Sequence, residues 1–511
     1  MQFWNRKVYY IWKAPSLQTP FRMFCSKKGD DKPLYPHYPA EIEQFMKKCD
    51  RNIEEMSVYD KTVRIRNLVN NIKEQSVWQF NPDSGMKKDP RLLSLVSSIE
   101  KEYTKLNSKN TFMYLLALSY FHLDDNSEFC EKISEDILAG KLQPQSYQDC
   151  MTLLNFYAKS AFANTEVLTK LEQACSIWNS KESLHNRINE FWTFNALEYY
   201  KHSTEYINNF EEMFLSLDED IEISLEHISK LLYCYSMINE DLNFEVLKRI
   251  LQNIIRRTDI FPENTAEKMP MPDDLYHSIA VIATSLTRLN IRNEKIFSMI
   301  ATRILCDSFH REVYKIKPKE SILIFEAFIR AEIYNYKLLR ELEGSFLRHI
   351  EDADSNTVAD MLLKHQMWSR VMINWRFVER NQKVSFNSYK KYSLVFINTL
   401  LKEIQKKGVI YLDYKTLFFV LKMGNIKYLK QRANSRELFQ VGLQGISVLM
   451  NHIDKIFDDP ERKEIEIFLY YTELSRCILN KESDRLVKEK FLEHGFDLEK
   501  LIQRVEAVMN M

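Results

Sequence analysis

The segment from residue 364 to residue 436 combines cationic and aromatic side chains in a pattern that could bind a polyanion. It holds 16 basic and 3 acidic residues, and its aromatic residues, among them Trp368, Tyr389 and Tyr411, alternate with the cations. Lysine and arginine neutralise phosphate, while aromatic or guanidinium planes stack on unpaired bases. The residues that we predict to contact RNA or an acidic partner are Arg370, Arg376, Arg380, Lys383, Lys390, Lys391, Lys415, Lys422, Lys427, Lys430, Arg432 and Arg436.

Three other interpretations of this segment stay open. The aromatic residues can belong to the core with the cations as their solvated faces, and pairs such as Lys390/Lys391 suit a solvated face equally well. The segment can instead contact anionic lipid head groups on a membrane surface. It can also bind the acidic region of a second copy, because residues 110 to 245 hold 23 acidic and 8 basic residues. That acidic region would repel phosphate, so we expect any RNA to bind locally.

Motifs for catalysis or metal binding are absent from the sequence. It contains no phosphate-binding loop, no HExxH motif and no paired-cysteine zinc motif, and its closest glycines, Gly442 and Gly445, lie inside a helical pattern. The stretch from Asp352 resembles the opening of a calcium loop, but Thr357 and Leu363 stand where that loop needs glycine and glutamate. We therefore expect no enzyme activity, no cofactor and no metal. A catalytic group assembled from distant positions stays open.

The composition favours a helical protein. The 511 residues include only 9 glycines and 13 prolines, and a chain poor in both favours long helices with short joints. Basic and acidic residues balance at 71 each. No stretch approaches the roughly 18 to 20 apolar residues that a membrane span needs. We expect the cysteines to be buried, reduced thiols, because none belongs to a CxxC motif; they are Cys25, Cys49, Cys130, Cys150, Cys175, Cys234, Cys306 and Cys477.

A helix–turn–helix pattern recurs along the chain. The clearest copies, aligned at the turn, are residues 156–168, 285–297 and 327–339, and looser copies begin near Ala117, Ala196, Cys234 and Phe419. Most successive copies begin 38 to 42 residues apart, and the one longer gap, of 51 residues, holds a proline-rich stretch from Phe261 to Pro272 that we predict to be an inserted loop.

Each copy carries an apolar stripe at helical spacing. Ile322, Phe325, Ile329 and Ile333, for example, advance by three or four residues. A single helix pair cannot bury such stripes, whereas pairs stacked side by side can. The sequence therefore predicts an all-α fold, an elongated α-solenoid of stacked helix-turn-helix repeats. In its core we expect Leu286, Leu289, Phe325 and Ile329.

The repeated hairpin, in which an aliphatic residue and a Lys or Arg precede the turn and an Asn follows it, resembles the degenerate repeats of FAST-kinase-like and RAP-domain organelle proteins. It is also similar to octotricopeptide and heptatricopeptide arrays. The resemblance covers roughly residues 110 to 450 and implies a role in handling organellar RNA. Two features depart from these families: Lys463 to Met511 reads as two further helices where a RAP module would stand, and the octotricopeptide motif with consecutive prolines is missing.

The first 28 residues have the composition of a mitochondrial transit peptide. They contain six cations and no acidic residue, with apolar and aromatic residues between the cations. The stretch Arg22-Met-Phe-Cys-Ser26 resembles a mitochondrial peptidase site, so we expect the mature protein to begin near Cys25. A basic tail without a targeting role is the alternative.

These features predict five regions. They are a transit peptide at 1–28, a linker and N-terminal helices at 29–109, helical repeats with an acidic first half at 110–350, basic, aromatic-rich repeats at 351–460 and capping helices at 461–511. We expect a non-catalytic mitochondrial binding protein of the matrix, or of the matrix side of the inner membrane, that associates with RNA or with the mitoribosome. The alternative is a structural or assembly subunit of a respiratory complex or of ATP synthase.

Overall fold

Helices account for every regular element that the structure describes. The computed structural model describes residues 43–44, 46–47, 53–74, 89–121, 127–160, 162, 164–178, 181–218, 221–238, 243–262, 275–310, 315–373, 386–424, 432–456, 459–477 and 480–509, and no strand occurs among them. The chain divides into two compact units, Met1–Ile221 and Glu222–Met511, each of which is described by itself. The predicted all-α class is confirmed. The boundary between the units falls inside the range predicted as acidic repeats.

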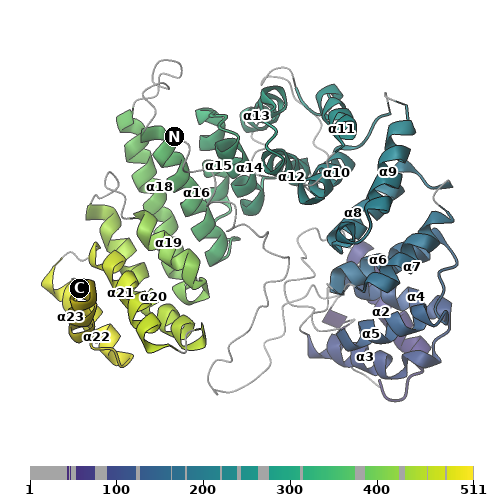
Figure 1. Cartoon of the computed structure of the whole chain (residues 1–511), viewed down its shortest axis with the longest axis horizontal. Coiled ribbons are helices and arrows are strands. Elements are labelled where there is room, and N and C mark those ends of the chain that lie inside the picture. Colours follow the sequence, from purple (N-terminus) through teal and green to yellow (C-terminus); the bar gives the residue numbers. More distant parts are fainter. Residues whose placement is uncertain are drawn as a thin grey trace. The chain divides into compact units, whose positions relative to one another are not determined.

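The first unit consists of paired helices. They are α2 (Val58–Glu74), α3 (Pro90–Glu102), α4 (Ser108–Phe121), α5 (Ser127–Leu138), α6 (Tyr147–Ser160), α7 (Thr165–Ser176), α8 (Leu184–Ala196) and α9 (Thr204–Ser216), with short 3₁₀ turns at Tyr103–Lys105 and Tyr199–Lys201. Helix α2 packs on α4, α4 on α6 and α6 on α8, while α5 packs on α7 (Figure 1). In these two rows a helix contacts the helix two places further on, which is how stacked hairpins bury their stripes.

The second unit continues the same order of contacts. Its helices are α10 (Leu225–Ile238), α11 (Phe244–Arg256), α12 (Leu275–Arg288), α13 (Glu294–Phe309), α14 (Pro318–Arg330), α15 (Tyr336–Arg348), α16 (Ser355–Ile373), α18 (Phe386–Lys407), α19 (Tyr414–Gly424), α20 (Arg432–Ile456), α21 (Pro460–Ser475), α22 (Lys481–Glu493) and α23 (Leu498–Met509), with a 3₁₀ turn, η7, at Val409–Tyr411. One row runs α10, α12, α14, α16, α18, α20, and a second row begins α11, α13, α15. This succession confirms the predicted solenoid stacking within the unit.

The turns of two clear repeats, those at 285–297 and 327–339, share one backbone form. Asn290 and Glu332, five residues after the start of their copies, both have φ of 56°. The residue after each donates its N–H to the carbonyl five positions earlier, at 2.8 and 3.0 Å respectively. This is the helix ending in which a left-handed residue satisfies the last carbonyls. Neither residue is glycine, so a chain with few glycines can still close its turns.

An asparagine starts the second helix of several hairpins. Asn164, Asn243, Asn293 and Asn335 each accept, through the side-chain oxygen, a backbone N–H from the first turn of the following helix. Such a cap satisfies a donor that the helix itself leaves unpaired and contributes about 1 kcal/mol. The Asn that follows the turn in the repeated pattern is therefore the helix N-cap.

The predicted core residues are mostly buried. Leu286, Phe325 and Ile329 are buried, whereas Leu289 is only half-buried. Neighbouring repeats meet through aromatic rings as well, since Phe297 of α13 and Phe328 of α14 pack edge to face with centroids 5.0 Å apart. The repeat register predicted from the sequence is therefore right, and Leu289 lies at the edge of the buried stripe.

Other predictions have mixed outcomes. The six cysteines that the structure describes are free and buried, as expected, while Cys25 and Cys49 lie outside the described residues. The predicted transit peptide, residues 29–40 at the start of the region predicted as linker and N-terminal helices, and most of the predicted loop from Phe261 to Pro272 also lie outside them. The C-terminal segment forms three helices, α21 to α23, where the sequence predicted two.

Among the described residues, no helix is long and apolar enough to cross a membrane.

Candidate functional site

Helix α19 is held in place by close packing against two glycines of α20. A Cβ atom at Gly442 would lie 3.0 Å from Leu421 Cδ2 of α19, and one at Gly445 would lie 2.5 Å from Leu417 Cδ2. On its other side, Tyr470 of α21 donates a hydrogen bond to the Gly442 carbonyl at 2.9 Å. The two glycines thus serve close helix packing, because any side chain there would push α19 or α21 away.

The packing divides α19 into a buried and an exposed face. Leu417, Val420 and Leu421 are buried. The opposite side carries Lys415, Phe419 and Lys422, which follow one another at intervals of four and three residues and so share one face of the helix. Both lysines are exposed, and Phe419 keeps 43% of its surface in solvent.

Tyr411 lies in the 3₁₀ turn η7, which ends three residues before α19 begins, and it is exposed as well. Its side chain is 67% exposed, and its carbonyl accepts a hydrogen bond from Asn356 Nδ2 at 3.1 Å. The ring lies against Gly408, which has φ of 99° and at which a Cβ atom would come within 3.0 Å of Tyr411 Cε2. We call Tyr411, Lys415, Phe419 and Lys422 the α19 face.

Positive charge on the α19 face is not neutralised by its described neighbours. Within the described part of the chain, Lys415 and Lys422 form no ion pair. The nearest carboxylate in sequence, Asp413, instead accepts hydrogen bonds from the backbone N–H and the hydroxyl of Thr416, at 2.9 and 2.6 Å. Arg436 on α20 is likewise exposed and without an ion pair among described residues.

Beneath the exposed face, polar groups are already paired with one another. The Tyr414 hydroxyl donates to Glu466 at 2.6 Å, and the Tyr414 ring stacks on His452 with centroids 4.3 Å apart. Burial, together with the bond to Glu466, raises the pKa of Tyr414. Burial lowers the pKa of His452, so that this imidazole is neutral at pH 7. The charge that the face presents therefore comes from its lysines.

Only part of the predicted binding set can be placed. Lys415, Lys422 and Arg436 are exposed. The helices contain Arg370, Lys390, Lys391 and Arg432, whose side chains lie outside the described ones, and the remaining predicted residues, Arg376, Arg380, Lys383, Lys427 and Lys430, lie outside the described residues altogether. Phe419 was missed as a surface residue, although its position between Lys415 and Lys422 at helical spacing could have indicated it.

Part of the basic segment belongs to the core. Trp368 is 1% exposed and its ring packs against Tyr334 with centroids 5.7 Å apart. Lys364 is buried and pairs with Glu326 at 2.9 Å and with Asp360 at 3.5 Å. The interpretation of aromatic residues as core therefore holds around α16, whereas the aromatic residues of the α19 face are exposed.

A buried serine, histidine and glutamate meet where α15, α16 and α18 pack together. His365 Nδ1 lies 2.5 Å from Glu343 Oε1, and His365 Nε2 lies 2.7 Å from Ser393 Oγ. The order matches a nucleophile, a base and an orienting acid, but all three side chains are fully buried. His365 therefore links α16 to α15 and α18 through these two hydrogen bonds. Sequence reasoning missed the cluster, whose members are 22 and 28 residues apart.

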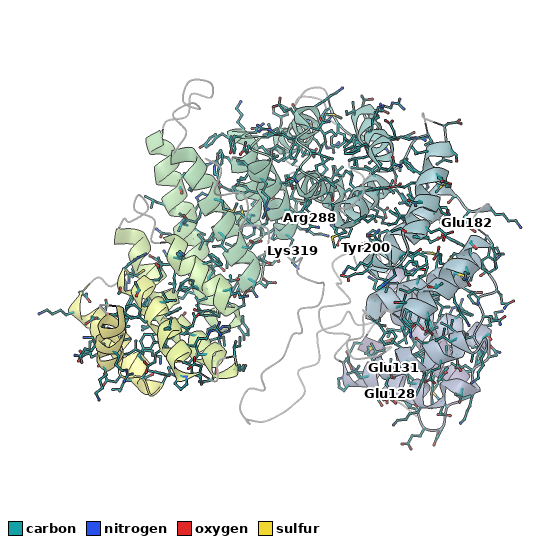
Figure 2. All side chains as sticks on the ribbon, viewed as in Figure 1. Glu128, Glu131, Glu182, Tyr200, Arg288 and Lys319 are labelled. Atoms are coloured by element: carbon teal, nitrogen blue, oxygen red, sulfur yellow. The ribbon has the colours of Figure 1, made fainter. Side chains whose placement is uncertain are left out.

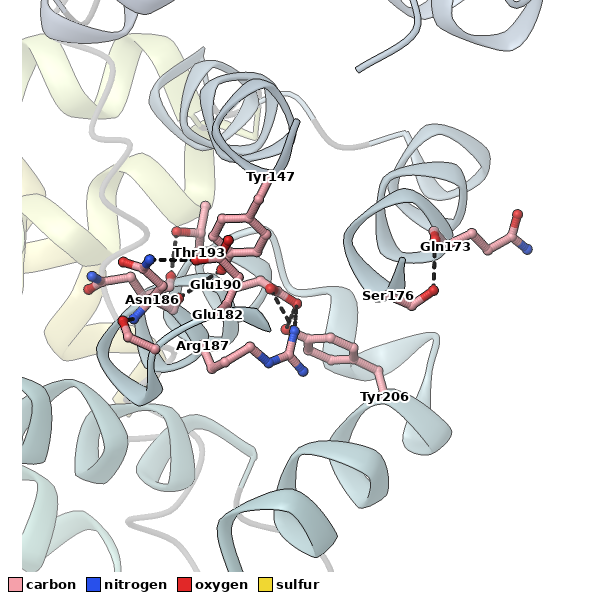
Figure 3. A network of polar contacts seen from close by, with 11 residues as sticks. Tyr147, Gln173, Ser176, Glu182, Asn186, Arg187, Glu190, Thr193 and Tyr206 are labelled. Carbon is pink, nitrogen blue, oxygen red and sulfur yellow. Dashed lines mark hydrogen bonds and ion pairs between the residues drawn. The ribbon is translucent and has the colours of Figure 1, made fainter. Parts of the chain in front are cut away.

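A second buried cluster occupies the first unit (Figure 3). Arg187 Nη1 donates to both oxygens of Glu190, at 2.8 and 2.7 Å, and the Tyr206 hydroxyl donates to Glu190 Oε1 at 3.2 Å. Burial raises the pKa of Glu190, an effect that Arg187 opposes. The Tyr147 hydroxyl donates to the carbonyl of Asn186 at 2.9 Å. The cluster joins α6, α8 and α9.

The surface of the first unit carries acidic residues, as its composition predicts. Glu128, Glu131 and Glu135 are exposed on one face of α5, and the first two are labelled in Figure 2. Lys132 pairs with Glu128 at 3.2 Å. This acidic face would repel a phosphate backbone, in contrast to the α19 face.

Comparison with protein families and with curated proteins gives no relative from which a function could be transferred. No protein-family model matches the chain, and no curated protein matches it.

Proposed function

We propose that this chain is a non-catalytic helical-repeat protein of mitochondria that binds RNA or a ribonucleoprotein such as the mitoribosome. The observation that supports this most is the α19 face, where Lys415 and Lys422 are exposed on the side opposite the buried leucines and form no ion pair with any residue that the structure describes. Exposed, unpaired cations are the groups that displace counterions from nucleic-acid phosphates.

The placement of charge supports local binding. Arg436 of α20 adds a third exposed cation to the hairpin of which α19 is the first helix. Lys364 of the same basic segment, in contrast, is buried and pairs with Glu326. Together with the acidic face of α5, this favours a single binding region on the second unit over contact along every repeat.

The second candidate is a structural or assembly subunit of a mitochondrial respiratory complex or of ATP synthase. Helix α21 favours it, because Ile465 and Leu469 stand one turn apart with 51% and 44% of their surfaces exposed. Exposed apolar groups that share a helix face are found at protein–protein contacts.

A purification from mitochondria distinguishes the two candidates. The tagged full-length chain is compared with the Lys415→Glu/Lys422→Glu/Arg436→Glu variant, and co-purifying RNA and proteins are sequenced. The matched control reverses Lys295, Lys319 and Lys337, three exposed lysines on other helices of the second unit. RNA should be recovered with the unchanged chain and with the control, and lost with the variant. Recovery of complex subunits without RNA would contradict RNA binding and support the second candidate.

A further inference from the structure

We propose that Tyr411 and Phe419 form a stacking platform, so that the α19 face binds single-stranded RNA through its unpaired bases. This inference rests on the proposed function and adds to it the form of RNA that is bound. It assigns the two rings a role in recognition, beyond the charge that the lysines supply.

The exposure of the two rings carries the argument. Aromatic side chains are normally buried for the apolar area they remove from water, and Trp368 in the same basic segment is buried accordingly. Tyr411, in η7, and Phe419, in α19, instead keep 67% and 43% of their surfaces in solvent. Aromatic groups left in water beside unpaired cations are the combination that binds bases and phosphates together.

The order of the residues suits a strand that follows the helix. Along the chain the face reads aromatic, cation, aromatic, cation, from Tyr411 to Lys422. Lys415 and Lys422 are separated by about 10 Å at the usual 1.5 Å rise per residue, and Phe419 lies between them. A strand whose phosphates meet the lysines would thus place its bases next to the rings.

The backbone that carries the Tyr411 ring is held by a hydrogen bond before any ligand arrives. Gly408 leaves room for the ring at its side, and the hydrogen bond from Asn356 to the Tyr411 carbonyl fixes the backbone. A backbone that is already ordered at this position loses less conformational entropy on binding. Gly408 has a positive φ that alanine would adopt only with strain, so this position maintains both the turn and the ring.

Duplex RNA cannot use such a platform. Its base faces are covered by neighbouring bases within the stack, and proteins recognise it mainly by shape and by backbone contacts. Unpaired bases offer a free face to a phenyl or phenol ring, and stacking tolerates any base. The α19 face should therefore prefer a single strand to a duplex, with little preference for sequence.

Fluorescence anisotropy with the full-length chain tests the platform. The probes are a labelled single strand of mixed sequence and the same strand annealed to its complement. Replacing Tyr411 or Phe419 by Ala should weaken single-strand binding about tenfold for each ring, while duplex binding and the number of phosphate contacts read from salt dependence stay unchanged. Tyr411→Phe should bind like the unchanged chain. Phe244→Ala/Phe309→Ala, which removes two exposed rings elsewhere in the second unit, is the matched control.

The outcomes separate the platform from the proposed function. If Lys415→Glu/Lys422→Glu abolishes binding but loss of the rings changes nothing, the platform is wrong and RNA binding stands. Equal weakening of single strand and duplex would also overturn it. No RNA binding at low salt would overturn both proposals. Ring-dependent binding to vesicles with anionic lipid, with no RNA affinity, would assign the face to a membrane surface instead.

Discussion

Tyr470 Oη donates a hydrogen bond to the carbonyl of Gly442 across 2.9 Å, which joins α21 to α20 at the level where α19 packs on the other side. The position of the α19 face therefore depends on close packing at a glycine of α20. The composition and charge of the residues in that face do not indicate this packing.

The first prediction concerns the glycines that hold α19. Gly445→Ala should lower the free energy of unfolding by about 1 to 3 kcal/mol, the usual cost of overpacking, because the new Cβ would meet Leu417 and the Tyr470 hydroxyl. Gly344→Ala in α15 is the control, since nothing lies within 4 Å of its Cβ. It should raise stability by about 0.5 to 1 kcal/mol. Urea unfolding followed by circular dichroism measures the free energy of unfolding of both variants. If Gly445→Ala and Gly344→Ala changed it by the same amount, α19 would not be close-packed against α20.

The second prediction concerns the buried serine, histidine and glutamate. His365→Leu should destabilise the protein by about 1 to 3 kcal/mol or more, because Glu343 and Ser393 lose a buried partner. Adding Glu343→Leu should recover part of this loss, since no carboxylate is then left unpaired. The unfolding free energies of the two variants measure the coupling. Labelling of Ser393 by a fluorophosphonate in the native protein would contradict a purely structural role.

The third prediction is a pH dependence of stability in the first unit. Burial raises the pKa of Glu100 to about 7, and Lys132 opposes the shift. The folded state therefore holds a proton that the unfolded state releases, so Glu100 reduces stability as pH rises from about 4.5 through 7. Glu100→Gln should be more stable than the unchanged chain at pH 8, and the difference should shrink toward pH 5. Unfolding curves of both proteins at pH 5 and pH 8 measure this. If Glu100→Gln changed the free energy of unfolding by the same amount at both pH values, this account would be excluded.

The fourth prediction concerns localisation. A fluorescent reporter fused to residues 1 to 40 should enter mitochondria, because this segment has a basic leader with no acidic residue before Asp30. Replacing its first six cations by glutamine is the control and should leave the reporter outside. A diffuse cytosolic signal from the unchanged fusion would contradict the proposal that the protein acts in mitochondria.

The repeats could be predicted because their signals are local. The asparagine caps, such as Asn293 and Asn335, and the stripe through Phe325 lie within a few residues of the turns they define. We predicted Leu289 to be buried, but it is only half-buried. The spacing of apolar residues shows which face of a helix packs against its neighbour, and it does not show how much of that face the neighbour covers. From the sequence we also predicted two C-terminal helices, whereas the structure has three, α21 to α23.

The candidate site was harder to predict because exposure depends on packing between distant segments. Trp368 and Tyr411 look alike in a basic, aromatic-rich sequence, yet the first is buried and the second exposed. The difference comes from their neighbours: Tyr334 covers Trp368, while Gly408 leaves the Tyr411 ring at the surface. The pairing of His365 with Glu343 likewise forms only when α15 and α16 pack together, so it could not be predicted from the sequence.

The salt dependence of RNA affinity tests the central claim most directly. Binding of a single-stranded RNA to the full-length chain is titrated at two salt concentrations, beside the Lys415→Glu/Lys422→Glu/Arg436→Glu variant. Each phosphate contact contributes about −0.7 to the slope of log affinity against log salt for a single strand. We predict steep weakening with salt in the unchanged chain and a slope shallower by about 2 in the variant, for three lost contacts. No affinity at low salt, or identical slopes for the two proteins, would contradict RNA binding by this surface.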